Sequence, residues 1–414
     1  MTVTRRMFDL TVEEHTLTVP LAWADDADER TIEVFASVVT ADGGSDKPYL
    51  LFLQGGPGFE APRALRHPSN PSWLDAALAH YRVVFLDQRG TGRSTPVGDH
   101  DLALGVDAVV ERMTELRADS IVRDAEALRE HLGAQTWSVL GQSFGGFCVL
   151  TYLSLAAASL DRVYLTGGLS TVERTPDEVY ALTYDKMRAA TMAYYRRFPE
   201  HRDAVARLVD LAVDGALVLP DGEVVSVSRV RSLGSLLGSD NGWQTLWGLL
   251  EKDPRSNAFR HELGGALPFS GRSPIYYVLH ESCYADGVAT RWAAERVEPA
   301  DFAADPTLLT GEHVRREWAS TVPSLAPWRE VADRLAEVAW GRLYDVDALA
   351  SSDARGAAAV YLNDVYVPFE YSMATAALLP GVRPWVTNQY EHSGLRAGEV
   401  LPRLIDLAHD RAVR

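Results

Sequence analysis

A chain of 414 residues with 47% hydrophobic content is long enough to bury a large core, with room for a second, inserted domain. Its formal net charge of −17 argues against nucleic acid as a partner, because phosphate backbones are bound by clustered Lys and Arg. No stretch approaches the ~18 apolar residues that span a bilayer, and residues 1–20 lack the apolar run of a secretory signal, so neither a membrane span nor export is expected.

The N-terminal part predicts an antiparallel hairpin. Apolar side chains alternate with polar ones in two stretches around a turn at residues 24–29: Leu17, Val19 and Leu21, then Ile32, Val34 and Ala36.

Short apolar runs follow, of the kind that forms buried parallel strands: Tyr49–Leu53, Arg82–Leu86, Trp137–Leu140 and Arg162–Thr166. Between the second and third runs, apolar residues from Ile121 to Leu132 recur at helical spacing, and Gly133 closes the pattern. This alternation of strand and helix predicts a mostly parallel sheet and an α/β fold.

The pattern changes at about Ser170 and becomes mainly helical. Thr175–Glu178 begins a helix, because it combines a capping hydroxyl, a proline in the first turn and acidic residues that favour the helix dipole. Helical patterns continue to about Trp318, with a hairpin-like piece at residues 219–227. We interpret this region as an inserted lid.

Strand patterns return at Ala357–Leu362 and Val382–Thr387, and an amphipathic helix is predicted from Gly398 to Ala412. The predicted organisation is a core formed by two segments around the lid: core residues 1–168, lid residues 169–325 and core residues 326–414.

The cysteine content is low. Cys148 and Cys283 lie far apart in the sequence and lack metal-ligand spacing, so a reduced, cytoplasmic setting is the simplest expectation. No metal or other cofactor is expected. The sequence does not determine the oligomeric state, and a homo-oligomer is one alternative.

A serine lies between a predicted strand and a helix in Gly141-Gln142-Ser143-Phe144-Gly145. A turn this tight needs small residues two positions before and after the serine, and it lifts the hydroxyl clear of the sheet. Ser143 is therefore the candidate nucleophile.

A serine hydroxyl needs an imidazole to take its proton, and the imidazole needs a carboxylate to hold its tautomer. In sheet-based hydrolases of this layout these partners follow the serine in the order acid, then His, on loops after strands. Asp364 and His392 each follow a predicted strand and meet this demand. The competing residues are Asp345, Asp347, Asp353 and His409.

Attack on a carbonyl also requires donors for the oxyanion. Gln54-Gly55-Gly56-Pro57-Gly58 follows the first core strand, and its glycines leave backbone N–H groups free to approach a substrate. We predict the N–H groups of Gly56 and Phe144 as the donors, since the residue after the nucleophile begins a helix and has no intrahelical acceptor. The alternative is a plain Gly-Pro turn.

These motifs resemble the proline iminopeptidase family of α/β-hydrolases. The resemblance extends from about residue 30 to the end of the chain and rests on these segments: Gly55–Gly58, Asp87–Ser94, Asp119–Glu126, Gly141–Gly146, Leu279–Tyr284, Leu309–Glu312, Asn363–Pro368 and Glu391–Gly394.

The resemblance implies an α/β-hydrolase fold and a serine aminopeptidase that releases an N-terminal residue, preferentially proline, from short peptides without a metal. Ser143, Asp364 and His392 fall on the family's catalytic positions. The family holds the substrate amine with lid carboxylates, and this implies Glu281 and, as a second candidate, Glu312. A buried carboxylate pairs with a protonated amine through a charge-assisted hydrogen bond; either acid could instead be a surface or capping residue.

The chain departs from the family pattern at two motif positions and in the length of its lid. Many members have His where this chain has Gln54 and Trp where it has Phe144, and compact members have a shorter lid; these differences affect the pocket wall and hence the residue preference. For Asp87–Ser94 we favour a structural role, in which Arg89 or Arg93 binds backbone carbonyls, over phosphate binding.

Aromatic lid segments, Tyr276-Tyr277 and Trp243–Trp247, are assigned to the lid core rather than to a pocket.

Other functions remain as alternatives. A small-molecule esterase or amidase would share the Ser, Asp and His residues but would not need an amine-binding carboxylate. An epoxide hydrolase normally attacks with a carboxylate, which a serine at position 143 disfavours. A non-catalytic binding protein on the same scaffold would not react with a fluorophosphonate.

Overall fold

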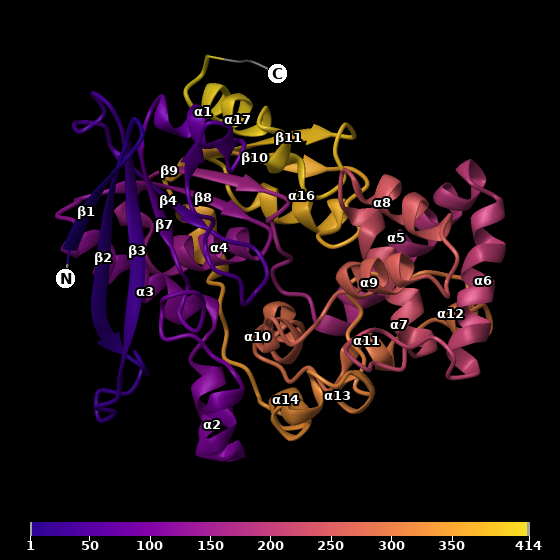
Figure 1. The fold of residues 1–414 in the computed structure, drawn as a ribbon. Coiled ribbons are helices and arrows are strands. Elements are labelled where there is room, and N and C mark those ends of the chain that lie inside the picture. The colour runs from indigo at the N-terminus through magenta and orange to yellow at the C-terminus, as the bar shows by residue number, and fades with distance from the viewer. Residues whose placement is uncertain (1, 412–414) are drawn as a thin grey trace.

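A nine-stranded sheet forms the centre of the molecule in the computed structural model, which describes residues 2–411; Met1 and residues 412–414 lie outside it (Figure 1). The order across the sheet is β1-β2-β3-β7-β4-β8-β9-β10-β11. The strands are β1 (Thr2–Met7), β2 (Leu10–Pro20), β3 (Thr31–Ala41), β4 (Tyr49–Leu53), β7 (Arg82–Leu86), β8 (Trp137–Gln142), β9 (Leu160–Thr166), β10 (Arg355–Tyr361) and β11 (Val382–Thr387), with a separate small pair β5 (Leu65–Arg66) and β6 (Ser69–Asn70).

The predicted N-terminal hairpin is confirmed: β2 and β3 pair antiparallel, with Val19 opposite Ile32. Strand β1, which the sequence analysis did not separate from this hairpin, adds to β2 at the edge of the sheet. All six residues of β1 are exposed, so it carries none of the one-sided apolar alternation by which strands are recognised.

The rest of the sheet is parallel, as predicted. Strands β7, β4, β8, β9, β10 and β11 pair in parallel with their neighbours, and β3 joins this part antiparallel to β7. Helices α3 (Ala118–His131) and α4 (Phe144–Ala156) pack on one face, whereas α1 (Leu74–Leu78) and α17 (Val400–Ala408) pack on the other. The carboxyl ends of β4, β8, β10 and β11 therefore meet along one rim of the sheet.

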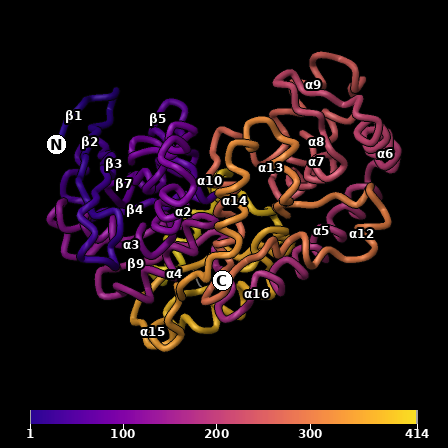
Figure 2. The backbone as a smooth tube through the Cα atoms, turned by 90° about the horizontal axis from the view of Figure 1, so that it is seen from below, coloured from indigo at the N-terminus to yellow at the C-terminus, as the bar shows by residue number. Residues whose placement is uncertain are grey.

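The lid helices gather to one side of the sheet, away from β1–β3, in both views (Figures 1 and 2). Thr175 caps α5, because its hydroxyl accepts the N–H of Glu178. The hairpin-like piece contains a single β-bridge between Val218 and Val224. The lid helices are α5 (Pro176–Arg197), α6 (Glu200–Val213), α7 (Val227–Arg231), α8 (Gly242–Leu250), α9 (Asn257–Ala266), α10 (Pro274–Val278), α11 (Ala293–Arg296), α12 (Ala300–Ala304) and α13 (Trp318–Thr321).

Helices continue beyond the predicted end of the lid. Helix α14 (Arg329–Ala336) packs against both α10 of the lid and α2 (Val106–Thr114) of the core, and α15 (Val346–Ser351) and α16 (Phe369–Ala377) cover the sheet. The boundary at residue 325 thus stays a prediction. The C-terminal helix α17 is shorter than predicted, and its predicted end at Ala412 lies outside the described residues. Within residues 2–411, no helix combines the length and apolarity that a bilayer span requires.

Candidate active site

Ser143 lies on a tight turn between β8 and α4 and has φ 55° and ψ −125°, a backbone conformation that residues other than glycine rarely adopt. A Cβ at Gly141 would come within 2.5 Å of the Gly145 carbonyl oxygen, and one at Gly145 within 1.9 Å of the Leu53 oxygen. Both glycines are therefore required by the turn, which presents the Ser143 side chain at the rim of the sheet.

Asp364 and His392 meet at the same rim, on the loops after β10 and β11. His392 Nδ1 lies 2.7 Å from Asp364 Oδ2, and the other oxygen, Oδ1, accepts the N–H groups of Tyr366 and Val367 at 2.9 and 3.0 Å. The carboxylate is 1% exposed. Since a carboxylate can only accept, a neutral His392 carries its proton on Nδ1, which leaves Nε2 free to act as a base.

Room for the imidazole comes from Gly167, the residue that directly follows β9. A Cβ at Gly167, which has φ 51°, would lie 2.9 Å from His392 Nδ1. Burial of the imidazole opposes its protonation, but the charge of Asp364 and its hydrogen bond outweigh this effect and raise the pKa of His392 above its ordinary value.

Ser143 and His392 line one cavity of about 730 Å³. In the part of the chain that the structure describes, no hydrogen bond joins the Ser143 hydroxyl to His392. Such contacts are often long in unliganded enzymes and shorten when substrate binds.

The loop predicted to stabilise the oxyanion borders the same cavity through Gly55 and Gly56. Gln54 forms two hydrogen bonds within this loop: its Oε1 accepts the Gly55 N–H at 3.0 Å, and its Nε2 donates to the Glu60 carbonyl at 3.3 Å. Gln54 therefore supports the loop in place of the histidine common in the family.

The ring of Phe144 does not line the Ser143 cavity. The ring packs against Phe147, with centroids 6.2 Å apart, and borders a small separate void with Pro57 and Cys283. As the first residue of α4, Phe144 has an N–H without an intrahelical acceptor. The side chain that stands where many family members have Trp therefore does not line the Ser143 cavity in this chain.

The contacts of the segment Asp87–Ser94 agree with the predicted structural role. Arg89 is 2% exposed, forms a bidentate ion pair with Asp124 at 2.6 and 2.7 Å, and donates to the carbonyls of Pro20, Leu21 and Glu115. A guanidinium with all these partners is not available to a phosphate.

Glu281 does not line the Ser143 cavity. Its carboxylate accepts the N–H groups of Ala293 and Ala294 at 3.1 and 2.9 Å, at the start of α11. Burial raises its pKa to about 7, and these two hydrogen bonds offset only part of that effect. The observed contacts are those of a capping acid, one of the alternatives stated for this residue.

Glu312, in contrast, lines the cavity with Ser143 and His392. The hydroxyl of Tyr276 donates to its carboxylate, and His280 Nε2 lies 3.7 Å away. Burial lowers the pKa of His280 to about 3, so this imidazole is neutral at physiological pH. Burial also raises the pKa of Glu312, and among the described residues no Lys or Arg forms an ion pair with it. The carboxylate can therefore receive a cationic ligand.

Two tyrosines of the cavity were not predicted. The assignment to the lid core is correct for Tyr277, which is 2% exposed, but wrong for Tyr276, which lines the cavity. Tyr366 also lines it, with its ring edge-on to His392 at 5.0 Å. Its position two residues after Asp364 was the available signal.

Hydrogen bonds tie the lid to the loop that carries His392. The backbone N–H of His392 donates to the Gly238 carbonyl at 3.0 Å. Asp240, two residues further along the lid, accepts the Glu391 N–H and the Ser393 hydroxyl, both at 2.8 Å. The lid segment before α8 thus fixes the backbone on both sides of the imidazole.

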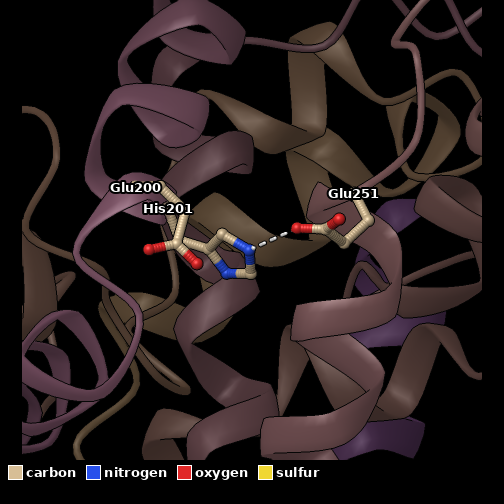
Figure 3. A group of neighbouring side chains, drawn as sticks. All are labelled: Glu200, His201 and Glu251. Carbon is tan, nitrogen blue, oxygen red and sulfur yellow. Dashed lines mark hydrogen bonds and ion pairs between the residues drawn. The ribbon is translucent and has the colours of Figure 1, made fainter.

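A separate group of metal-ligand types, Glu200, His201 and Glu251, lies in the lid, with ligand atoms within 4.8 Å of one another (Figure 3). Both ring nitrogens of His201 already have partners: the Tyr194 hydroxyl at 2.8 Å and Glu251 at 3.1 Å. We interpret the group as a link between α6 and α8.

Comparison with known proteins gives consistent matches. A sequence model of the α/β hydrolase fold matches residues 48–207. The chain is 42% identical to a proline iminopeptidase of Aeromonas sobria, over 96% of each chain, and 31% identical to one of Aspergillus aculeatus, over 93% of this chain and 91% of the relative. It is also 36% identical to a proline iminopeptidase of Xanthomonas citri, over only 29% of this chain. The chain belongs to the proline iminopeptidase family of α/β hydrolases.

Proposed function

We propose that this protein is a serine exopeptidase that releases the N-terminal residue, preferentially proline, from short peptides through an acyl-enzyme intermediate. The observation that carries the proposal is the position of Glu312. It adds to the cavity that holds Ser143 and His392 an acid with which no Lys or Arg of residues 2–411 forms an ion pair. An exopeptidase must recognise the chain end, and such an acid suits a protonated amine.

In the proposed mechanism, Glu312 binds the substrate amine while Ser143 Oγ attacks the carbonyl carbon of the first residue. His392 Nε2 takes the hydroxyl proton, and the N–H groups of Gly56 and Phe144 stabilise the oxyanion. His392 then protonates the leaving nitrogen as the C–N bond breaks. Water, deprotonated by His392, attacks the ester, releases the amino acid and restores the Ser143 hydroxyl.

The Asp364 carboxylate acts through His392. Two backbone N–H groups and the imidazole hold it in a site that is 1% exposed, so its charge is little screened by water. It fixes the tautomer that leaves Nε2 free and stabilises the imidazolium that forms during attack.

Replacing Glu312 with glutamine tests the amine site. Glutamine keeps the shape and the ability to accept from Tyr276 but removes the charge, so kcat/KM for a prolyl arylamide is expected to fall about 100-fold. Steady-state kinetics on the purified variant measure this loss. Glu281→Gln is the matched comparison, and an equal loss there would assign the amine to Glu281 instead.

An acetylated substrate separates the exopeptidase from a simple esterase or amidase. N-acetylprolyl arylamide has no cationic amine to pair with Glu312, and we expect the wild-type enzyme to cleave it at least about 100-fold more slowly than prolyl arylamide. Equal turnover of the two arylamides would contradict the proposal and favour the esterase or amidase alternative.

The pH dependence follows from the state of His392. The base must be neutral, and its pKa is raised above the ordinary ~6.5, so activity is present at higher pH and is lost as the pH falls through that raised value. The acid limb of a kcat/KM profile for prolyl arylamide should therefore have its midpoint above pH 6.5. A midpoint near pH 5 would contradict the assignment of His392 as the base.

We further propose a reducing, cytoplasmic setting for the enzyme. Cys148 and Cys283 are both free and buried, and burial raises the pKa of both thiols, which keeps them protonated and unreactive. A protein without disulfides fits such a compartment.

A further inference from the structure

Arginines are unusually frequent around the catalytic cavity, although acidic residues outnumber basic ones in the chain by 57 to 40. The charged residues that line it, apart from His392, are Arg63, Arg93, Arg272 and Arg396, with Glu60 and Glu312. The cavity is therefore more basic than the protein as a whole. This difference suggests that the substrate brings a negative charge as well as a positive one.

Most of these arginines already have acidic partners. Their shortest ion-pair distances are as follows: Arg63 with Asp87 at 2.6 Å, Arg93 with Glu14 at 3.1 Å and Arg272 with Glu60 at 2.7 Å. Each of these guanidinium groups is compensated by a carboxylate of the protein.

Arg396 differs from the other three. It is an exposed residue, and within residues 2–411 its guanidinium forms no ion pair or hydrogen bond. Only its backbone is engaged: its N–H donates to the Ser393 carbonyl, and its own carbonyl accepts the Ser72 hydroxyl. Arg396 is thus the cavity arginine whose charge is left for a ligand.

The position of Arg396 relates it to the leaving group of the reaction. It lies four residues after His392, on the short 3-10 helix Gly394–Ala397, and its charge acts on the imidazole. In the proposed mechanism His392 protonates the leaving nitrogen, so the residue after the scissile bond must lie beside His392. In a dipeptide, that residue bears the C-terminal carboxylate.

We propose that Arg396 binds the free carboxylate of dipeptides and makes them the preferred substrate class; this inference rests on the proposed function. A peptide chain spans at most ~3.6 Å per residue, so the amine and carboxylate of a dipeptide lie within about 7 Å of each other. Both ends fit in a cavity of about 730 Å³. Glu312 takes the ammonium group, Arg396 takes the carboxylate, and Ser143 attacks the carbonyl between them.

The test compares Pro-Ala with its C-terminal amide, which differ only in the negative charge. We expect the wild-type enzyme to show a kcat/KM about tenfold higher for the acid than for the amide, the scale of a partly exposed charge-assisted contact. In Arg396→Gln this ratio should fall to near one, and in Arg396→Lys it should lie between. Arg272→Gln is the matched control, since it removes a cavity arginine that already has a partner, and it should keep the wild-type ratio.

Two results would overturn the inference. One is an equal acid-to-amide ratio in the wild-type enzyme and in Arg396→Gln. The other is an equal loss of the ratio in Arg272→Gln, which would assign the preference to the general charge of the cavity. Prolyl arylamide has no carboxylate and therefore separates the two proposals. If the wild-type enzyme cleaves it and either result above is found, the proposed function stands, but the role of Arg396 does not. Failure to release proline from all three substrates overturns both.

Discussion

Replacing Ser143 with alanine is expected to reduce kcat for a prolyl arylamide by roughly a million-fold, the scale on which serine hydrolases respond to loss of the nucleophile. The covalent step becomes impossible, because no other hydroxyl has the position on the turn after β8. The substitution removes only one oxygen and leaves both glycines of the turn in place, so the fold should be retained.

The measurement is the initial rate of arylamide hydrolysis, together with labelling by a fluorophosphonate, which should react with the wild-type enzyme and not with the variant. Ser154→Ala is the matched control, since Ser154 lies on the same helix α4, and its hydroxyl donates to the Leu150 carbonyl. That variant should remain within about threefold of wild type. Turnover within tenfold of wild type in Ser143→Ala would show that another residue attacks the substrate.

Replacing Asp364 with asparagine should lower kcat about 10⁴-fold while the protein stays folded. The asparagine oxygen can still accept the N–H groups of Tyr366 and Val367, so its amide nitrogen then faces His392 Nδ1. An amide nitrogen is a donor, so the imidazole must place its proton on Nε2, where it cannot take a proton from Ser143. The charge that raises the pKa of His392 is lost as well.

Kinetics at pH 8 measure the loss of kcat, and circular dichroism checks the fold. The matched control is Asp345→Asn, because Asp345 was a competing candidate from the sequence. It accepts the Ala348 N–H and caps helix α15, away from the residues that line the cavity. Its kcat should remain within about twofold of wild type. A 10⁴-fold loss in this control, with activity kept in Asp364→Asn, would contradict the assignment.

Strands β4, β8 and β10 could be predicted because they are buried on both faces and therefore form continuous apolar runs. Strand β11 lies at the edge of the sheet and buries only Val382, but it too was predicted from its residues. The turn at Ser143 could be predicted because backbone contacts forbid side chains at Gly141 and Gly145. The two glycines in the sequence therefore indicate the geometry of the turn. Asp364 and His392 follow strands that end at the same rim, and they are hydrogen-bonded there. Their catalytic roles remain predictions for the experiments above.

The lid was harder to interpret, because a motif identifies a residue and not the direction of its side chain. The sequence favoured Glu281 over Glu312 as the amine-binding acid, yet Glu281 caps α11 and Glu312 lines the cavity. Tyr276 and Tyr277 are adjacent, but they face different surroundings because neighbours on a helix point about 100° apart. Such differences depend on contacts between distant segments, which periodicity does not report.

The hydrogen bonds from Gly238 and Asp240 to the backbone around His392 have a consequence for how substrates enter. Swinging this part of the lid outward would break those contacts and displace the general base, so an enzyme opened in that way would be inactive. A substrate admitted by such a movement could be cleaved only after the lid had returned and restored these hydrogen bonds. Access to the cavity by this route and the activity of the general base therefore depend on the same hydrogen bonds.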